Sequence, residues 1–242
     1  ITVVFLSCTA GIGNSIVVET KEKNYRDLEK FTFIICWGTG FCSACLLCLY
    51  QPFMEIWVGK NLMLPFLMVI CFVIYFFARQ LNALFNLYKD ASGMWHEDRF
   101  RPLIAALTNL ALNLILVQFI GIYGIVVSTV LAILCVGMPW LLHNLFTVIF
   151  EKKYLYGYLK KLLYYCFIVF ISCVITCFVC SKINLGLIMT LVIRSIICVA
   201  LPNLLYLFVY HKRREYIESL ALVDKMTKGK LKGLLMKLGM PR

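Results

Sequence analysis

The sequence predicts an all-α, polytopic membrane helix bundle, and three observations predict it. Of the 242 residues, 62% are hydrophobic and 15% are charged, whereas a soluble domain is about 45–50% apolar and about 25% charged. Long stretches contain no Asp, Glu, Lys or Arg, and the basic residues gather in the connections between them. This composition excludes an ordinary cytosolic enzyme, a disordered tail and a nucleic-acid reader.

The charge-free stretches define the predicted helices. They are 1–18, 31–54, 61–78, 102–150 and 162–181, and the stretch 183–211 contains only Arg194. A helix needs about 20 predominantly apolar residues to cross a bilayer. The stretch 102–150 is long enough for two helices, with a tight turn at Gly121–Gly124 where glycine permits the necessary dihedral angles. We therefore expect a lobe at 1–210 with seven spans: 1–18, 31–50, 63–88, 102–120, 123–147, 161–181 and 185–210.

The chain opens at Ile1 within apolar sequence. It shows no initiator Met, no basic region before the apolar stretch and no signal-peptide cleavage site. We expect it to be a fragment of a longer protein that lacks an N-terminal portion.

The basic residues predict the topology. One set of connections (19–30, 89–101, 148–160 and the tail from 211) holds 20 Lys and Arg when Lys161 is counted at its edge, and the other set holds only Lys60 and Lys182. Connections rich in Lys and Arg face the cytoplasm. The net charge of +12 is thus interpreted as a topology signal, and no nucleic-acid partner is expected.

The tail 211–242 interleaves lysines with apolar residues. This pattern is typical of a basic amphipathic helix on the anionic cytoplasmic leaflet. Gly229 and Gly233 favour breaks, so we expect two short helices at best. A disordered basic tail is the alternative.

Most of the twelve cysteines lie inside the predicted spans. Cys42, Cys45 and Cys48 have the spacing of a metal or cluster site, and Cys173, Cys177 and Cys180 form a second series. Within apolar helices, cysteine behaves as a small hydrophobe, and zinc sites need solvated thiolates with supporting groups. We expect both series to be packing residues, with no metal and no cofactor.

Polar side chains inside the spans are the candidate substrate site, because intramembrane ionisable groups are costly and mark function. Arg79, Asn82 and Asn86 follow one helical face, and Asn109 and Asn113 are one turn apart on the next helix. Together they are predicted to line one polar cavity in which Arg79 would bind a phosphate. The alternatives are that Arg79 snorkels or pairs with carbonyl groups, and that the asparagines join helices.

Arg194 is the other basic residue within a span. It is predicted either as a second cavity cation or as a residue that pairs with a neighbouring helix. No catalytic residue is expected, because nucleotide-binding and hydrolase motifs are absent from the sequence. The adjacent carboxylates Glu97 and Asp98 lie in a connection and are not expected to converge on one substrate atom.

Four segments, in this order along residues 1–210, carry a family resemblance. They are Gly11–Ser15 with Glu19; Pro52–Gly59; Asp90–Trp95 with Asp98–Pro102 and Asn109; and Gly121–Gly124 with Ser128 and Thr129. They resemble the motifs of Wzx-type O-antigen and capsule flippases of the multidrug/oligosaccharidyl-lipid/polysaccharide (MOP) exporter superfamily. The chain departs from the family pattern at Ser128, where glycine is frequent, at Met94, where leucine is usual, and in lacking a first lobe.

The resemblance implies the C-terminal lobe of a MATE/MOP-like two-lobe transporter in the bacterial cytoplasmic (inner) membrane, with a cytoplasmic tail. The implied function is movement of polyprenyl-pyrophosphate-linked oligosaccharides for surface polysaccharide (lipopolysaccharide or capsule) biosynthesis, without enzymatic activity. Membrane lipids, a polysaccharide polymerase and glycosyltransferases are the implied partners besides the lipid-linked substrate. Rival readings are a cation-coupled multidrug antiporter of the same superfamily, an integral-membrane polysaccharide-assembly enzyme and a structural subunit.

Overall fold

The computed structural model describes residues 8–226, with side chains excepted at 215 and 222–226. Within this range six helical segments are long and apolar enough to cross a membrane, and no strand occurs. The chain is therefore a multi-pass, all-α membrane protein, as the sequence predicts. Of the expected first span, 1–18, the structure describes only helix α2 (Thr9–Val18), and residues 1–7 lie outside the described range.

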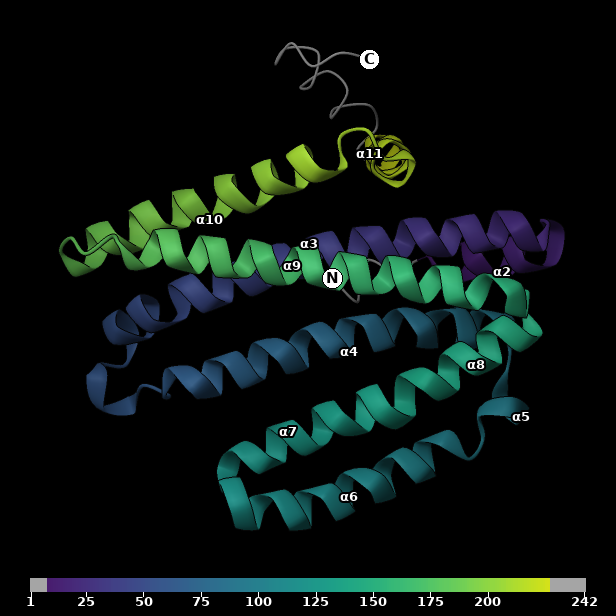
Figure 1. Cartoon of the computed structure of the whole chain (residues 1–242), viewed down its shortest axis with the longest axis horizontal. Coiled ribbons are helices and arrows are strands. Elements are labelled where there is room, and N and C mark those ends of the chain that lie inside the picture. The colour runs from purple at the N-terminus through teal and green to yellow at the C-terminus, as the bar shows by residue number, and fades with distance from the viewer. Residues whose placement is uncertain (1–7, 227–242) are drawn as a thin grey trace.

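The long helices run alternately in opposite directions. They are α3 (Lys21–Trp57), α4 (Phe66–Ser92), α6 (Arg101–Ile120), α7 (Ile122–Ala132) continued by α8 (Met138–Val148), α9 (Leu155–Ser181) and α10 (Leu187–Tyr210). Helix α3 packs against α4, α9 and α10, whereas α6 packs mainly on α7 at one edge (Figure 1). The α2–α3 junction, α5 (Trp95–Asp98) and η3 (Lys152–Tyr154) lie at one end of the bundle, which we call the basic end. The 3-10 turn η1 (Lys60–Leu62) lies at the opposite end.

Helix α3 begins earlier than the apolar pattern predicts. The side chain of Thr20 accepts a hydrogen bond from the Lys23 backbone N–H at 3.3 Å, and Glu22 lies in the positively polarised first turn. Both features favour helix initiation at Lys21. The charged residues 21–30 therefore extend α3 by about 15 Å beyond its apolar part, and the connection expected at 19–30 is mostly helical.

The α6–α7 hairpin forms where the sequence predicts it. Gly121 has a φ of +58°, a conformation that favours glycine. A Cβ atom at Gly124 would lie 2.6 Å from the backbone carbon of Leu116, so only glycine lets the two backbones approach this closely. This turn confirms that 102–150 contains two antiparallel helices.

The span expected at 123–147 is not uniform. It contains a π-helical turn, η2 (Ile133–Gly137), between α7 and α8. Pro139 has no N–H to donate to the carbonyl four residues earlier, and a π turn is one way for a helix to accommodate such a residue. The sequence interpretation missed this turn.

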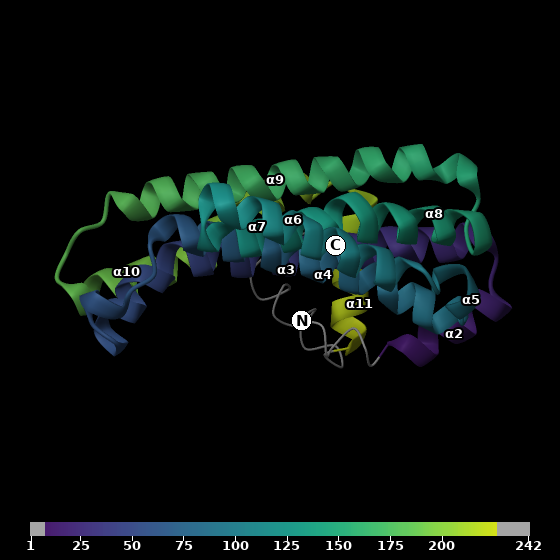
Figure 2. The same ribbon diagram turned by 90° about the horizontal axis from the view of Figure 1, so that it is seen from below.

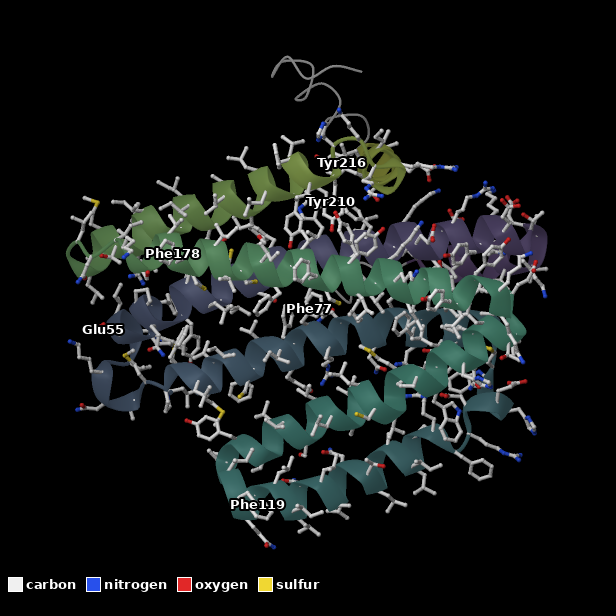
Figure 3. The ribbon with its side chains drawn as sticks, viewed as in Figure 1. Glu55, Phe77, Phe119, Phe178, Tyr210 and Tyr216 are labelled. Atoms are coloured by element: carbon white, nitrogen blue, oxygen red, sulfur yellow. The ribbon has the colours of Figure 1, made fainter. Side chains whose placement is uncertain are left out.

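Helix α11 (Arg214–Met226) crosses the long axis of the bundle and packs on α3 (Figure 2). The Tyr216 ring meets Phe33 edge-on, with ring centroids 6.1 Å apart, and lies 5.9 Å from Trp37. Tyr210 and Tyr216 lie between α10, α11 and α3 (Figure 3). Such aromatic side chains gather at the level where apolar and polar surroundings meet. The predicted breaks at Gly229 and Gly233 lie outside the described residues.

Candidate functional site

Arg79 lies on the exposed face of α4, far from either end of the helix. It is 13 residues beyond Phe66, which corresponds to about 20 Å along the axis. Its Nη1 donates a hydrogen bond to the hydroxyl of Tyr75 at 2.6 Å, and the guanidinium lies 5.9 Å from the centre of that ring. Tyr75 is one turn earlier on the same helix, so it orients the guanidinium without neutralising its charge.

Asn82 and Asn86 turn toward other parts of the bundle. The Oδ1 of Asn86 accepts a hydrogen bond from Arg101 Nη2 at 2.9 Å, and its Nδ2 donates to the Asn82 carbonyl at 2.8 Å. The Oδ1 of Asn82 is buried without a hydrogen-bond partner among the described residues. It lies near Gly137, where an added Cβ would be 3.5 Å from it. Asn82 therefore faces the π turn η2.

Asn109 and Asn113 belong to the α6–α7 contact. Asn109 Oδ1 accepts a hydrogen bond from the Thr129 hydroxyl at 3.5 Å, and Asn113 Oδ1 is buried without a partner in the described part of the chain. Helices α7 and α8 lie between α4 and α6 over most of their length (Figure 1). The 63–88 and 102–120 helices are therefore separated over most of their length, and a cavity lined by both of them stays a prediction.

Arg194 lies on α10, on the far side of α3 and α9 from α4 (Figure 1). Its Nη2 donates to the carbonyl of Ile183 at 3.0 Å, in the α9–α10 connection. Its Nε is buried and has no hydrogen-bond partner among residues 8–226. The pairing alternative therefore describes Arg194, and the two intramembrane arginines do not converge within this chain.

An ion-pair cluster that the sequence interpretation missed closes the basic end between α4 and α6. Asp98 accepts hydrogen bonds from Arg101 Nε at 2.5 Å and Nη2 at 2.7 Å, and its carboxylate lies 3.6 Å from Lys89 Nζ. Asp98 and Lys89 are buried, and Lys89 Nζ lies 4.2 Å from the centre of the Trp95 ring. Asp98 and Arg101 are three residues apart, a spacing typical of helical ion pairs. This spacing was the feature of the sequence that could have predicted the pair.

Glu97 and Asp98 have opposite environments. Glu97 is exposed, whereas Asp98 is 3% exposed and held by two cations. Two carboxyl groups that face different surroundings do not act on one substrate atom. The segment 90–102 therefore has a structural role in the bundle, because it ties the start of α6 to the end of α4.

A second polar cluster joins α3, α9 and α11. Lys161 Nζ lies 2.9 Å from Glu29, and Lys30 Nζ lies 3.0 Å from both Asp27 and Glu218. Burial raises the pKa of Glu218, but hydrogen bonds from Arg214 and Lys30 outweigh this effect, so the pKa lies below its usual 4.5. Glu218 thereby anchors α11 to α3.

The two cysteine series meet at the opposite end of the bundle. The sulfur atoms of Cys48, Cys180 and Cys198 lie within 4.8 Å of one another, and all three residues are buried. Cys45 and Cys177 pack against them. Cysteines from α3, α9 and α10 thus form one thiol cluster, defined as Cys45, Cys48, Cys177, Cys180 and Cys198. Spacing along single helices could not predict this meeting.

No protein-family model matches this chain, and neither curated protein sequences nor solved structures show significant similarity to it.

Proposed function

We propose that this chain is the C-terminal lobe of a flippase that moves polyprenyl-pyrophosphate-linked oligosaccharides across the bacterial cytoplasmic membrane. The observation that carries the proposal is Arg79, an exposed arginine within a membrane-spanning helix. The four sequence segments that resemble Wzx-type flippases support the same assignment.

The physical argument concerns the surroundings of Arg79. A charged side chain facing lipid near the bilayer centre is costly, so such residues face water-filled cavities or other protein. Helix α4 leaves Arg79 uncovered, and its hydrogen-bond acceptor, the Tyr75 hydroxyl, is neutral. The exposed face of α4 therefore needs a partner surface or an anionic ligand. In the proposed transporter, this face borders the cavity shared with the other lobe, and the guanidinium binds the substrate pyrophosphate bidentately.

The orientation is part of the proposal. The basic end, where the connections 19–30, 89–101 and 148–160 with their Lys and Arg residues lie, faces the cytoplasm. Helix α11 then lies near the cytoplasmic leaflet, and α9 and α10 connect on the outer side. Alternating access about a site within the membrane is the mode of transport that this arrangement would serve.

The rival functions lack a supporting observation. A cation-coupled antiporter would use intramembrane carboxylates, but the stretches 31–54, 61–78, 102–150 and 162–181 contain no Asp or Glu. A polysaccharide-assembly enzyme would need a sizeable outer segment or a polar catalytic pair. The connection between α3 and α4 spans only residues 58–65 and includes η1.

The test expresses the Arg79→Ala and Arg79→Lys variants of the protein in its native cells. Lys182→Ala, which removes a basic residue from the α9–α10 connection, is the control. Losing a charge-assisted contact worth about 1.5–3 kcal/mol is expected to slow export roughly tenfold or more. Lipid-linked oligosaccharide should accumulate in Arg79→Ala cells, and surface polysaccharide should fall. Arg79→Lys should retain part of the activity, and Lys182→Ala should retain all of it.

The readouts are mass spectrometry of extracted polyprenyl-linked glycans and quantification of surface polysaccharide at matched protein levels. Normal surface polysaccharide in Arg79→Ala cells would contradict the role of Arg79. No accumulation of lipid-linked glycan on deletion of the gene would overturn the flippase assignment itself.

A further inference from the structure

The thiol cluster has the dimensions of a metal site. The sulfur atoms of Cys48, Cys180 and Cys198 lie within 4.8 Å of one another. Zinc–sulfur bonds of about 2.3 Å place the sulfurs of three ligands roughly 3.8–4.0 Å apart in tetrahedral or trigonal arrangements. Cys180 and Cys198 already meet this distance, with sulfurs 4.0 Å apart. Closing the set around an ion needs movements of less than about 1 Å, which side-chain rotation can supply.

Two further cysteines surround this triad. Cys177 Sγ lies 3.5 Å from Cys48 Sγ, and Cys45 packs on the same group. Cys48 therefore has a further sulfur close by, which can occupy a fourth position or stabilise the ligand by hydrogen bonding. Soft thiolate ligands select thiophilic ions over magnesium or calcium.

Arg194 provides the charge that such a site needs. Arg194 lies one helical turn before Cys198 on α10, and its Nε is buried with no hydrogen-bond partner in the described residues. Three thiolates and one guanidinium carry a net charge of −2, which a divalent ion cancels. Near-neutrality matters here, because a net charge at an apolar helix interface is costly.

From this geometry we infer that Cys48, Cys180 and Cys198 form a binding site for a thiophilic divalent d10 cation of the zinc class, with Arg194 as the charge-balancing residue. On binding, the three thiols release their protons to water and three metal–sulfur bonds form, without oxidation or reduction. The ion joins α3, α9 and α10 close to the α9–α10 connection. The site stands independently of the flippase proposal, since its cysteines lie on α3, α9 and α10 whereas Arg79 lies on α4.

The experiment titrates the reduced chain in lipid nanodiscs with Zn²⁺ against a chromophoric chelator, and with Cd²⁺ to detect thiolate charge-transfer absorption. We expect one ion per chain and a charge-transfer band. The double variant Cys48→Ser/Cys198→Ser should lose the stoichiometric binding and the charge-transfer band, and its affinity for the metal ion should be at least tenfold weaker. The matched control Cys71→Ser/Cys135→Ser removes the same number of thiols outside the cluster and should bind as the unmodified chain does.

A second measurement needs no variant. Zn²⁺ should protect Cys48, Cys180 and Cys198 from alkylation by N-ethylmaleimide, read by peptide mass spectrometry, while Cys71 and Cys135 remain reactive. Unchanged stoichiometry in the cluster variant, or equal protection of all cysteines, would overturn the site. Binding of Cu⁺ but not Zn²⁺ or Cd²⁺ would refute its divalent character. A Cys48–Cys177 disulfide in place of metal binding would also contradict it.

Discussion

Helices α3 and α6 are both apolar enough to span a membrane, but they occupy opposite positions in the fold. Half of the most apolar stretch of α3 is buried within the protein, whereas no residue of α6 is buried. Helix α3 packs on three long helices, and α6 packs mainly on α7. Apolar character therefore determines that both cross the membrane and does not determine which is central.

The difference lies in which residues face other helices. The buried face of α3 includes the small or polar residues Thr39, Gly40 and Ser43. A Cβ at Gly40 would lie 2.3 Å from the Tyr206 hydroxyl oxygen, so this glycine lets α10 approach closely. The outer surface of α6 carries bulky apolar side chains such as Leu110 and Phe119. Lipid tails are as apolar as leucine, so helix association in membranes depends on close packing of small residues and on hydrogen bonds.

The largest expected effect compares the same residue type on the two helices. Phe33 on α3 is 2% exposed and contacts the rings of Tyr165, Tyr210 and Tyr216. Phe119 on α6 is 79% exposed and points away from the bundle (Figure 3). Phe33→Ala should lower the free energy of unfolding by about 3–5 kcal/mol, and Phe119→Ala should change it by less than about 0.5 kcal/mol. Unfolding in bicelles titrated with SDS measures both, and equal effects would invalidate the contrast.

A smaller effect is expected where α6 is anchored. Asp98→Asn removes the charge that Arg101 and Lys89 share, and hydrogen bonds to charged groups contribute about 1.5–3 kcal/mol. The same unfolding measurement should show a loss of this size. The neighbouring exposed carboxylate provides the control, and Glu97→Gln should leave stability nearly unchanged. If both substitutions have the same effect, the ion-pair cluster does not hold α6 to α4.

The smallest effect concerns the docking of α11 on α3. Because the pKa of Glu218 is lowered in the docked state, its contribution is full above about pH 4.5 and is lost as pH falls through the lowered pKa. Fluorescence anisotropy of a noncanonical fluorescent residue at the exposed position Ile217 should therefore fall at low pH. Glu218→Gln should remove this pH dependence. An unchanged pH profile in that variant would assign the docking to the Tyr216 contacts alone.

Much of the architecture was predictable from local patterns. Of the seven spans predicted from the charge-free stretches, six correspond to helices long and apolar enough to cross a membrane, and the structure describes only Thr9–Val18 of the seventh. Gly121 identified the α6–α7 turn. The lateral arrangement was not predictable, because α4 and α6 are separated only by two short connections and α5 but do not pack along their lengths. The lateral arrangement also decided the partners of the candidate site residues: Asn86 faces Arg101, Asn109 faces Thr129 and Arg194 faces Ile183. Of the six predicted residues, only Arg79 lies on an exposed surface, and no carboxylate that the structure describes pairs with its charge.

The sequence by itself determined which segments are apolar enough to span the membrane and how the basic residues divide between the two sets of connections. It could do so because each helix in lipid must satisfy its own backbone hydrogen bonds locally. Only the tertiary structure decided which face of each helix meets which neighbour. Residues far apart in the chain, such as Cys48 and Cys198 or Lys30 and Glu218, come together through the rotation and pairing of helices. Those choices depend on steric fit between whole surfaces, which no single helix contains.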